Sequence, residues 1–234
     1  MAELLFREDS YLTACEATVV AVHANAVELD RTVFYPLGGG QAGDTGTIGP
    51  WRVLDTRKGE AGDSVLHLLD PAAKPEVGMK LPISIDWERR HRLMRYHTAL
   101  HLLGSVVKAP VTGGRIGDDK AHLDFDIEME KLAKDEIEER VNRLTQAAHA
   151  TRSFWITDAE LDARPQLVRT MSVAPPRGEG RVRLLEIPGV DLQACGGTHV
   201  KNTAEIGRLA VARIRSEGKR NKRVTLAFAD DRQA

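Results

Sequence analysis

The first part of the chain alternates short apolar runs with turn residues. Residues 17–30 are rich in Val and Ala, and residues 46–70 hold apolar runs separated by Gly, Asp and Lys. Residues 78–90 add a run in which apolar and polar positions alternate. Short strands bounded by turn residues at this spacing are typical of a small barrel. The pattern predicts a β-barrel-like domain over residues 1–85.

A different periodicity begins after this section. Apolar side chains recur at spacings of three and four in residues 87–109, and the same spacing returns in residues 129–150. This is the pattern of a helix with one apolar face. The apolar positions are Leu93, Tyr96, Leu100, Leu103 and Val107 in the first helix, and Ile137, Val141, Leu144 and Ala148 in the second.

Strand patterns are interleaved with these two helices. Residues 110–128 predict a glycine turn and a strand, and residues 153–165 predict a strand that runs into a short helix. Residues 181–200 predict a strand followed by a glycine loop, and residues 205–229 predict a hairpin with a basic turn. The mixture predicts an α+β domain over residues 86–234.

Composition narrows the possible functions only slightly. The 234 residues are 42% hydrophobic and 29% charged, with a net charge of −1, which is typical of a globular protein. Any contact with a polyanion therefore requires a local basic patch. We expect no membrane span, because no apolar run is long enough. The two cysteines, Cys15 and Cys195, lie far apart, so we expect no disulfide framework and a reducing, cytoplasmic setting.

Candidate chemistry begins with a pair of histidines in the first predicted helix. His97 and His101 are four residues apart, a spacing that places two side chains one above the other on a helix face. This is the metal-binding geometry of the H-E-x-x-H motif, but positions 98 and 99 are Thr and Ala. The pair can hold a metal, whereas the glutamate base of a peptidase is absent.

A second pair with the same spacing lies in the glycine loop. Cys195 and His199 are separated by two glycines and a threonine. Together with His97 and His101 they form a set of three imidazoles and one thiol, which favours zinc. Four protein ligands would close a tetrahedral site, whereas a catalytic zinc keeps one position open. His199 is therefore either a ligand or a neighbour of the ligands.

Four motifs in this order resemble the alanyl-tRNA editing family, which comprises the editing domain of alanyl-tRNA synthetase and the free-standing AlaX proteins. The motifs are FYPLGGGQAGDTG at 34–46, HTALHLL at 97–103, GVDLQACGGTHV at 189–200 and SEGKRNKRV at 216–224. The resemblance covers nearly the whole chain. Because the chain carries no aminoacylation domain, it is most similar to the medium-length AlaX form.

The resemblance implies a barrel-like domain followed by an α+β editing domain with a zinc site. It implies hydrolysis of the ester in tRNA(Ala) mischarged with serine, and also with glycine, by a free-standing enzyme that needs no obligate protein partner. His97, His101, Cys195 and His199 would then be both metal ligands and catalytic residues. The zinc would either acidify a water molecule or position the substrate.

The resemblance also implies substrate contacts away from the metal. The loop formed by Gly38, Gly39, Gly40 and Gln41 would approach the aminoacyl end and contribute to serine selection. Arg115 stands where glutamine is frequent in the family and is a further candidate contact. Lys219 and Lys222 lie in the basic hairpin turn, whose other basic residues are Arg213, Arg215, Arg220 and Arg223. Such side chains bind the tRNA backbone through its phosphates.

Two other functions remain compatible with the sequence. The editing domain of threonyl-tRNA synthetase shares the HxxxH and CxxxH pattern, so the chain could edit another mischarged tRNA. Alternatively, it could be a zinc-stabilised tRNA-binding module without catalytic activity. The glycine-rich motif favours the alanine-specific family.

Overall fold

The computed structural model describes residues 2–60, 64–168 and 180–230. The chain divides into two compact units, Met1–Leu93 and Met94–Ala234. The division falls inside a long helix, α2 (Trp87–Val106), whereas the sequence predicted a domain boundary at residue 85. No helix in the described part of the chain is long and apolar enough to cross a membrane.

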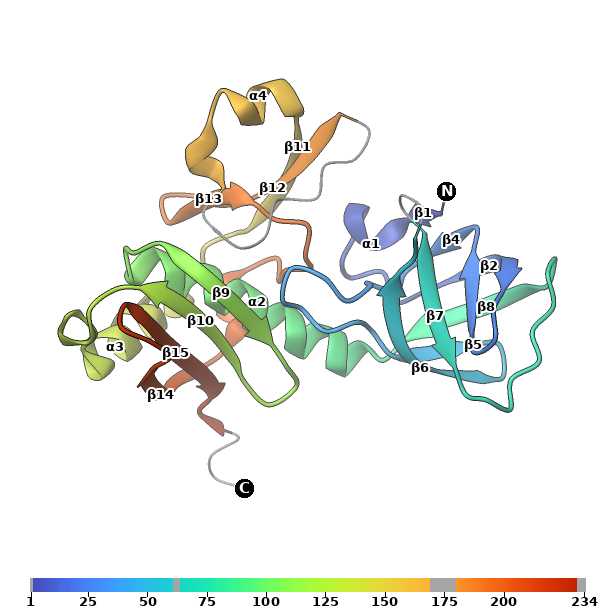
Figure 1. Ribbon diagram of the computed structural model, residues 1–234, viewed down its shortest axis with the longest axis horizontal. Helices are drawn as coiled ribbons and strands as arrows, with labels where there is room; N and C mark the ends of the chain where they lie inside the picture. The colour runs from blue at the N-terminus through green and yellow to red at the C-terminus, as the bar shows by residue number, and fades with distance from the viewer. Residues whose placement is uncertain (1, 61–63, 169–179, 231–234) are drawn as a thin grey trace. The chain divides into compact units, whose positions relative to one another are not determined.

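The first unit contains a closed six-stranded barrel in the order β2-β3-β7-β6-β5-β8 (Figure 1), as the sequence predicted. Its core includes Val27, Leu29, Phe34, Ile48 and Ile83, all buried. The strands are β2 (Ala14–Val22), β3 (Ala26–Leu29), β5 (Gly46–Ile48), β6 (Trp51–Lys58), β7 (Val65–Leu69) and β8 (Lys80–Ile85), with β1 (Glu3–Leu4), α1 (Leu5–Glu8) and β4 (Arg31–Thr32) beside them.

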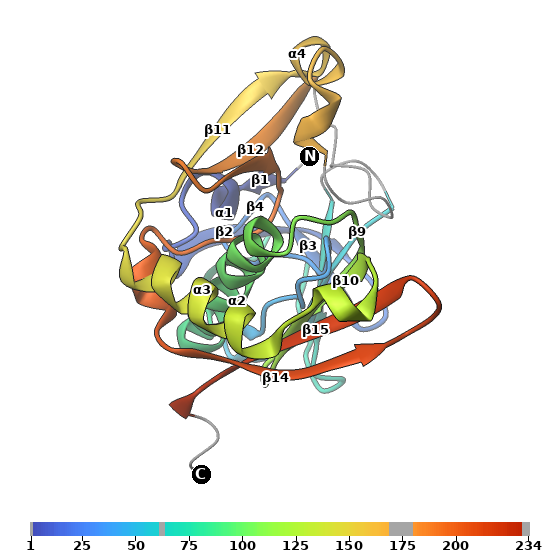
Figure 2. The same ribbon diagram turned by 90° about the vertical axis from the view of Figure 1, so that its left-hand side faces the viewer.

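The second unit combines two antiparallel sheets with helices, which confirms the α+β prediction. The larger sheet has the order β14-β15-β10-β9, and the smaller one has the order β11-β12-β13. Figure 2 shows α2 and α3 on the same side of the larger sheet. The elements are β9 (Val111–Ile116), β10 (Ala121–Asp126), η1 (Met129–Lys131), α3 (Lys134–Gln146), β11 (Arg152–Thr157), α4 (Asp158–Asp162), η2 (Pro165–Leu167), β12 (Arg181–Ile187), β13 (Asp191–Ala194), η3 (Thr203–Ile206), β14 (Leu209–Ser216) and β15 (Asn221–Phe228).

The predicted second helix is shorter than its sequence pattern. A 3₁₀ turn, η1, precedes α3, and the helix ends at Gln146. Ala148, expected on the apolar face, is exposed and has a positive φ of 53°. Asn202 donates its side-chain amide to the Ala148 carbonyl at 2.9 Å, and the Thr203 hydroxyl accepts from the His149 amide at 2.9 Å. These contacts with a distant segment replace the next helical hydrogen bonds.

A buried ion pair fixes the start of α2 within the first unit. The side chains of Arg90 and Asp44 are 0% and 2% exposed. Arg90 Nε lies 3.0 and 2.9 Å from the two Asp44 oxygens, and the guanidinium also donates to the carbonyls of Ser10 and Val33 at 3.0 and 2.7 Å. Asp44 accepts the Tyr35 amide at 2.6 Å. The pair therefore closes the base of the glycine-rich loop, and loss of one partner would cost roughly 3–5 kcal/mol.

A second buried polar group sits in the barrel. His67 is fully buried, its Nδ1 lies 3.1 Å from the Val27 carbonyl, and its Nε2 lies 2.8 Å from the Thr32 hydroxyl. Because the carbonyl only accepts, Nδ1 carries the proton and Nε2 accepts from Thr32. Burial lowers the pKa of His67 to about 4, although the Val27 carbonyl and the Glu28 carboxylate oppose the shift. The residue is thus a neutral packing histidine.

We predict that His67 makes the unfolding free energy fall as the solution is acidified. The unfolded chain takes up the proton near pH 6.5, whereas the folded chain does so only near pH 4. The contribution of neutral His67 to the unfolding free energy is complete above pH 6.5 and is lost between pH 6.5 and pH 4. About 2 kcal/mol of it is lost by pH 5. Urea unfolding of wild type and His67→Gln at pH 7.5 and 5 should show the gap between them shrinking by about that amount. A gap independent of pH would contradict the assignment.

Candidate metal centre and substrate-binding residues

Two histidines project from α2 toward the same point. His97 and His101 are one helical turn apart, and both are buried, at 7% and 6% exposure. Their ring centroids are 5.4 Å apart. The helix therefore supplies two imidazoles from one rigid element, as the sequence spacing predicts.

The other two members come from the loop that follows β13. Arg183, on β12, donates its guanidinium to the carbonyls of Gly197 and Cys195 at 2.8 and 3.3 Å. The Cys195 amide in turn donates to the Arg183 carbonyl at 3.0 Å. Cys195 is partly buried, and His199 is 5% exposed. The loop is rich in glycine, which allows its backbone many conformations, but the buried arginine holds that backbone in one of them.

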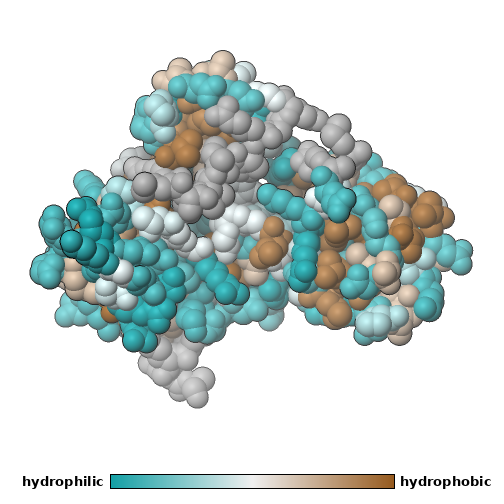
Figure 3. Space-filling model, viewed as in Figure 1, coloured by the Kyte–Doolittle hydropathy of each residue, from teal (hydrophilic) through white to brown (hydrophobic). Residues whose placement is uncertain are grey.

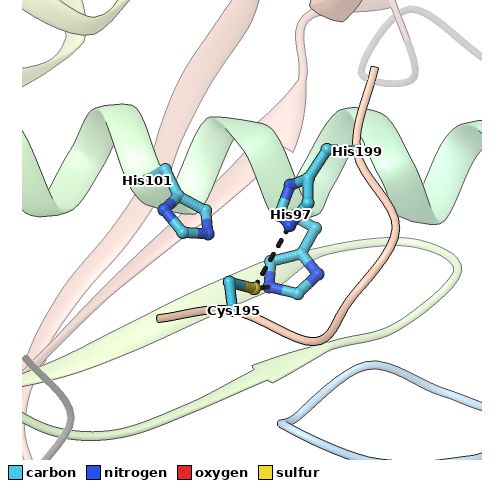
Figure 4. A group of neighbouring side chains, drawn as sticks. All are labelled: His97, His101, Cys195 and His199. Carbon is cyan, nitrogen blue, oxygen red and sulfur yellow. Dashed lines mark hydrogen bonds between the residues drawn. The ribbon is translucent and has the colours of Figure 1, made fainter. Parts of the chain in front are cut away.

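The four side chains converge on one point (Figure 4). One ligand atom from each of His97, His101, Cys195 and His199 lies within 4.8 Å of every other. Cys195 Sγ is 3.5 Å from His97 Nε2 and 3.2 Å from His199 Nε2. The structure therefore brings together all four residues that the sequence singled out, His199 included, and the group could hold a metal ion.

Two further side chains fix which ring nitrogens face this point. Asp191 Oδ2 lies 2.8 Å from His101 Nδ1, and both side chains are buried. The Thr98 hydroxyl donates to the Met94 carbonyl at 3.0 Å and lies 3.3 Å from His199 Nδ1. Each Nδ1 then carries the hydrogen, which leaves each Nε2 lone pair for a metal.

Gln193 adds a second donor to the Asp191 carboxylate. Gln193 Nε2 lies 2.6 Å from Asp191 Oδ2 and 2.9 Å from His101 Nδ1. Both nitrogens donate to the same oxygen, and their mutual approach follows from that shared acceptor. The carboxylate is therefore held in place by two donors, and it holds His101 in turn.

Electrostatics prepare the thiol to act as a ligand. Burial alone would raise the pKa of Cys195, but the neighbouring His97 and His199 and the hydrogen-bond contacts of the sulfur with His101 and His199 hold that pKa well below its ordinary value. Burial also opposes the charge on His101, yet Asp191 and Cys195 raise the pKa of His101 to about 9. Burial and the charge of His97 lower the pKa of His199 to about 3.

This donor set fits a metal ion. A thiolate and neutral imidazoles are the forms that bind metals, and the thiolate is favoured here without one. His199 is held neutral, whereas His101, whose pKa is raised, must release a proton from Nε2 when a metal binds. The bound ion would be balanced by the Cys195 thiolate and, one step further out, by the Asp191 carboxylate.

The predicted substrate loop is a tight turn in the first unit. Gly38 and Gln41 exchange backbone hydrogen bonds of 3.1 and 2.9 Å, and Gly39 and Gly40 between them have φ values of 56° and 83°. Positive φ at both central positions is the type I′ turn, which favours glycine. Tyr35 donates its hydroxyl to the Gly38 carbonyl at 2.8 Å. Gln41 is fully buried, whereas Gly39 is exposed at the tip.

The predicted basic contacts have unequal surroundings. Arg115 on β9 and Lys219 in the hairpin turn are exposed. Lys222 is buried at 5% exposure, and its ammonium donates to Ser216 Oγ and to the carbonyls of Gly218 and Lys219 at 3.1, 2.6 and 2.8 Å. A phosphate contact by Lys222 would compete with these three hydrogen bonds, which stabilise the turn.

Sequence reasoning missed four residues that support the centre. Thr98 was considered only because it stands where the H-E-x-x-H motif has its glutamate, and Asp191, Gln193 and Arg183 were not considered as part of the site. Asp191 had a usable signal, because a carboxylate four residues before Cys195 lies in the same strand-loop segment. Arg183 had none, since its role depends on the pairing of β12 with β13.

Comparison with known proteins relates part of the second unit to a domain of aminoacyl-tRNA synthetases. A family model described as "Threonyl and Alanyl tRNA synthetase second additional domain" matches residues 182–225, which include Cys195 and His199. This segment contains β13, the loop after it and most of the hairpin formed by β14 and β15. The chain therefore carries a domain of the kind found in these two synthetases.

Full-length relatives narrow this class. The alanyl-tRNA editing proteins AlaX-M of Saccharolobus solfataricus and Methanosarcina mazei are 36% and 34% identical, covering 96% and 98% of this chain and 98% of each relative. The alanine–tRNA ligase of Ignicoccus hospitalis is 37% identical over 90% of this chain but only 24% of that enzyme. The chain belongs to the AlaX-M family of alanyl-tRNA editing proteins.

We predict that Asp191→Asn weakens metal binding by about 10- to 100-fold, the usual cost of losing a partner of a ligand. The variant keeps the shape of the side chain but removes the charge beside His101. Competition with a chromophoric chelator for Zn²⁺ measures the affinity of the folded protein. Asp124→Asn, which breaks an ion pair with Arg223 instead, is the matched control. Equal affinity in wild type and Asp191→Asn would refute the positioning role.

Proposed function

We propose that this protein hydrolyses the aminoacyl ester of mischarged tRNA(Ala) as a free-standing editing enzyme. The observation that carries the proposal is the buried group of three histidines and one cysteine in a chain whose full-length relatives are named alanyl-tRNA editing proteins. The AlaX-M names support the substrate, and the match within alanine–tRNA ligases supports an activity related to aminoacylation.

Zinc is the metal that we propose for the centre. One thiolate and three imidazoles form a donor set that zinc prefers. His97, His101 and Cys195 would hold the ion. His199 would either be the fourth ligand or give up its coordination position to the substrate. Bound there, zinc would supply Lewis-acid chemistry, by acidifying water or by polarising the ester.

The protein's own side chains serve this chemistry by holding donors still. Asp191 and Thr98 keep hydrogens on the far nitrogens of His101 and His199, so that Nε2 stays available. Arg183 prevents the Cys195 loop from moving away, since it binds two loop carbonyls. A fixed donor set needs little reorganisation when the substrate arrives.

Serine and glycine are the amino acids that we propose are removed. A pocket for alanine cannot strongly reject glycine, which is smaller, or serine, which adds one hydroxyl, and single-step discrimination of this kind reaches about 10- to 200-fold. A second hydrolytic site corrects the remainder. Gly39 and Gly40 would offer backbone amides to the aminoacyl group, because the hydrogen bonds that close the turn involve Gly38 and Gln41.

We predict that Ser-tRNA(Ala) and Gly-tRNA(Ala) are hydrolysed at least about tenfold faster than Ala-tRNA(Ala), the difference that a second sieve must provide. Deacylation of a panel of labelled aminoacyl-tRNAs measures the rates, with mischarged tRNA(Thr) as the specificity control. Equal or faster loss of alanine would exclude editing. A preference for mischarged tRNA(Thr) would assign the chain to another editing reaction.

We predict that Cys195→Ala lowers hydrolysis by more than about 100-fold, beyond the loss typical of an indirect partner, while the chain stays folded. Removal of the metal by a chelator should have the same effect, reversed by added zinc. Cys15→Ala, which changes the other of the two cysteines, is the control and should retain activity. If Cys195→Ala loses its circular dichroism together with tRNA binding, and wild type never deacylates tRNA, a zinc-stabilised binding module is the better description.

A further inference from the structure

The larger sheet of the second unit has two unlike faces. Residues Ala121, Leu123 and Phe125 of β10 alternate with His122 and Asp124, and the first set faces the helices, because Leu123 is the nearest side chain to Gly104 of α2. The second set lies on the opposite face. Figure 3, viewed as in Figure 1, shows a largely hydrophilic surface over β10 and β15. We call this surface the polar face.

Strand register aligns one row of side chains across the polar face. Arg115 of β9 is paired with His122 of β10, His122 with Thr225 of β15, and Thr225 with Arg213 of β14. The row crosses three strand gaps, which is about 14 Å. Arg115 and Arg213, almost a hundred residues apart in sequence, thus form the two ends of a single row, which we call the cross-sheet row.

Most of the other cations on this sheet are already engaged. Three of them form ion pairs with carboxylates, and the Lys222 ammonium donates hydrogen bonds within the hairpin turn. The ion pairs join Arg223 with Asp124, Arg215 with Glu217, and Arg220 with Asp126. Within the described residues, no carboxylate forms an ion pair with Arg115, Arg213 or Lys219. The charge available to a partner is therefore located at both ends of the cross-sheet row and at the tip of the hairpin.

Neutral hydrogen-bonding groups lie between the two arginines. His122 and Thr225 make no side-chain hydrogen bond within the described part of the chain. Burial, followed by the charge of Arg223, lowers the pKa of His122, so its ring is neutral near pH 7. A neutral imidazole and a hydroxyl offer one donor each, without adding charge.

We propose that the polar face binds the sugar–phosphate backbone of RNA through the cross-sheet row, with Arg115 and Arg213 on separate phosphates. The proposal rests on the proposed function and adds a docking surface to it. Arginines at the ends of a row suit phosphate binding, and a hydroxyl and an imidazole suit phosphate or ribose oxygens. Such contacts read the backbone and not the bases, so they position the molecule without specifying its sequence.

The chemistry of the face favours RNA over a protein partner. Where the structure describes it, the face is polar and hydrogen-bonding, and none of the exposed large hydrophobic side chains lies on its four strands. It therefore lacks the apolar anchors that carry most protein interfaces. Among the described residues, the charges on this face without an ion pair are all positive, and they are spaced apart on the sheet and its hairpin turn. An acidic polymer with regularly repeated charges satisfies them without burying apolar surface.

Binding of uncharged tRNA(Ala) to the zinc-loaded full chain tests the proposal. Fluorescence anisotropy with labelled tRNA gives the affinity between 50 and 200 mM salt for wild type and the double variant Arg115→Gln/Arg213→Gln. We expect about tenfold weaker binding at 50 mM salt and a log–log salt slope shallower by about 1.5, since each lost phosphate contact removes 0.7–0.9. Both side chains are exposed, so the fold should persist, as thermal unfolding can verify.

Lys134→Gln is the matched control, because Lys134 is an exposed cation on α3, the helix layer on the other face of the sheet. It should leave the affinity and the salt slope unchanged. If the double variant matches wild type in both quantities, or if Lys134→Gln reduces the salt slope by half as much as the double variant does, the polar face is not the docking surface. A wild type that binds tRNA but deacylates none would refute the proposed function alone.

Discussion

The convergence of the Cys195 thiol with three imidazoles in a buried space is the arrangement on which the rest of the second unit depends. Four polar atoms cannot be buried this close together unless each is fixed and satisfied. Because the two pairs are almost a hundred residues apart in sequence, the helix α2 and the loop after β13 must be set independently and then held together. The sheets and the buried polar contacts around the group meet that requirement.

The supporting contacts divide this task among different elements. Thr98 lies on α2 between the two histidines, yet it acts on His199 from the opposite loop, and its oxygen also accepts the Val200 amide at 3.2 Å. Asp191 lies on β13 but acts on His101 of the helix. Each side therefore orients a ligand of the other side. An error in packing would misplace two ligands at once, so the site and the fold are coupled.

The sequence was sufficient for the parts that depend on local spacing. The pattern of four residues between His97 and His101 predicts a helix face, and the alternating runs before residue 85 predict barrel strands. Local patterns fail where a distant segment intervenes. Ala148 continues a helical pattern but leaves the helix because Asn202 and Thr203 bind the adjoining backbone. The glycines after Cys195 indicate a loose loop, yet Arg183 holds it from a neighbouring strand. Neither partner is visible from spacing.

A count of basic residues in the sequence says little about which of them are available to bind a phosphate. The hairpin appears strongly basic as a string of letters, but strand pairing sets Arg223 opposite Asp124, and Lys222 folds back onto its own turn. A cation that already has a partner contributes little to a distant phosphate, because the neighbouring carboxylate cancels its field. Arg115 has no basic neighbours in sequence, yet register places it in one row with Arg213. The positive surface of this domain is therefore set by strand register at Arg115 and Arg213, with Lys219 at the hairpin tip, and not by the number of basic residues in the hairpin sequence.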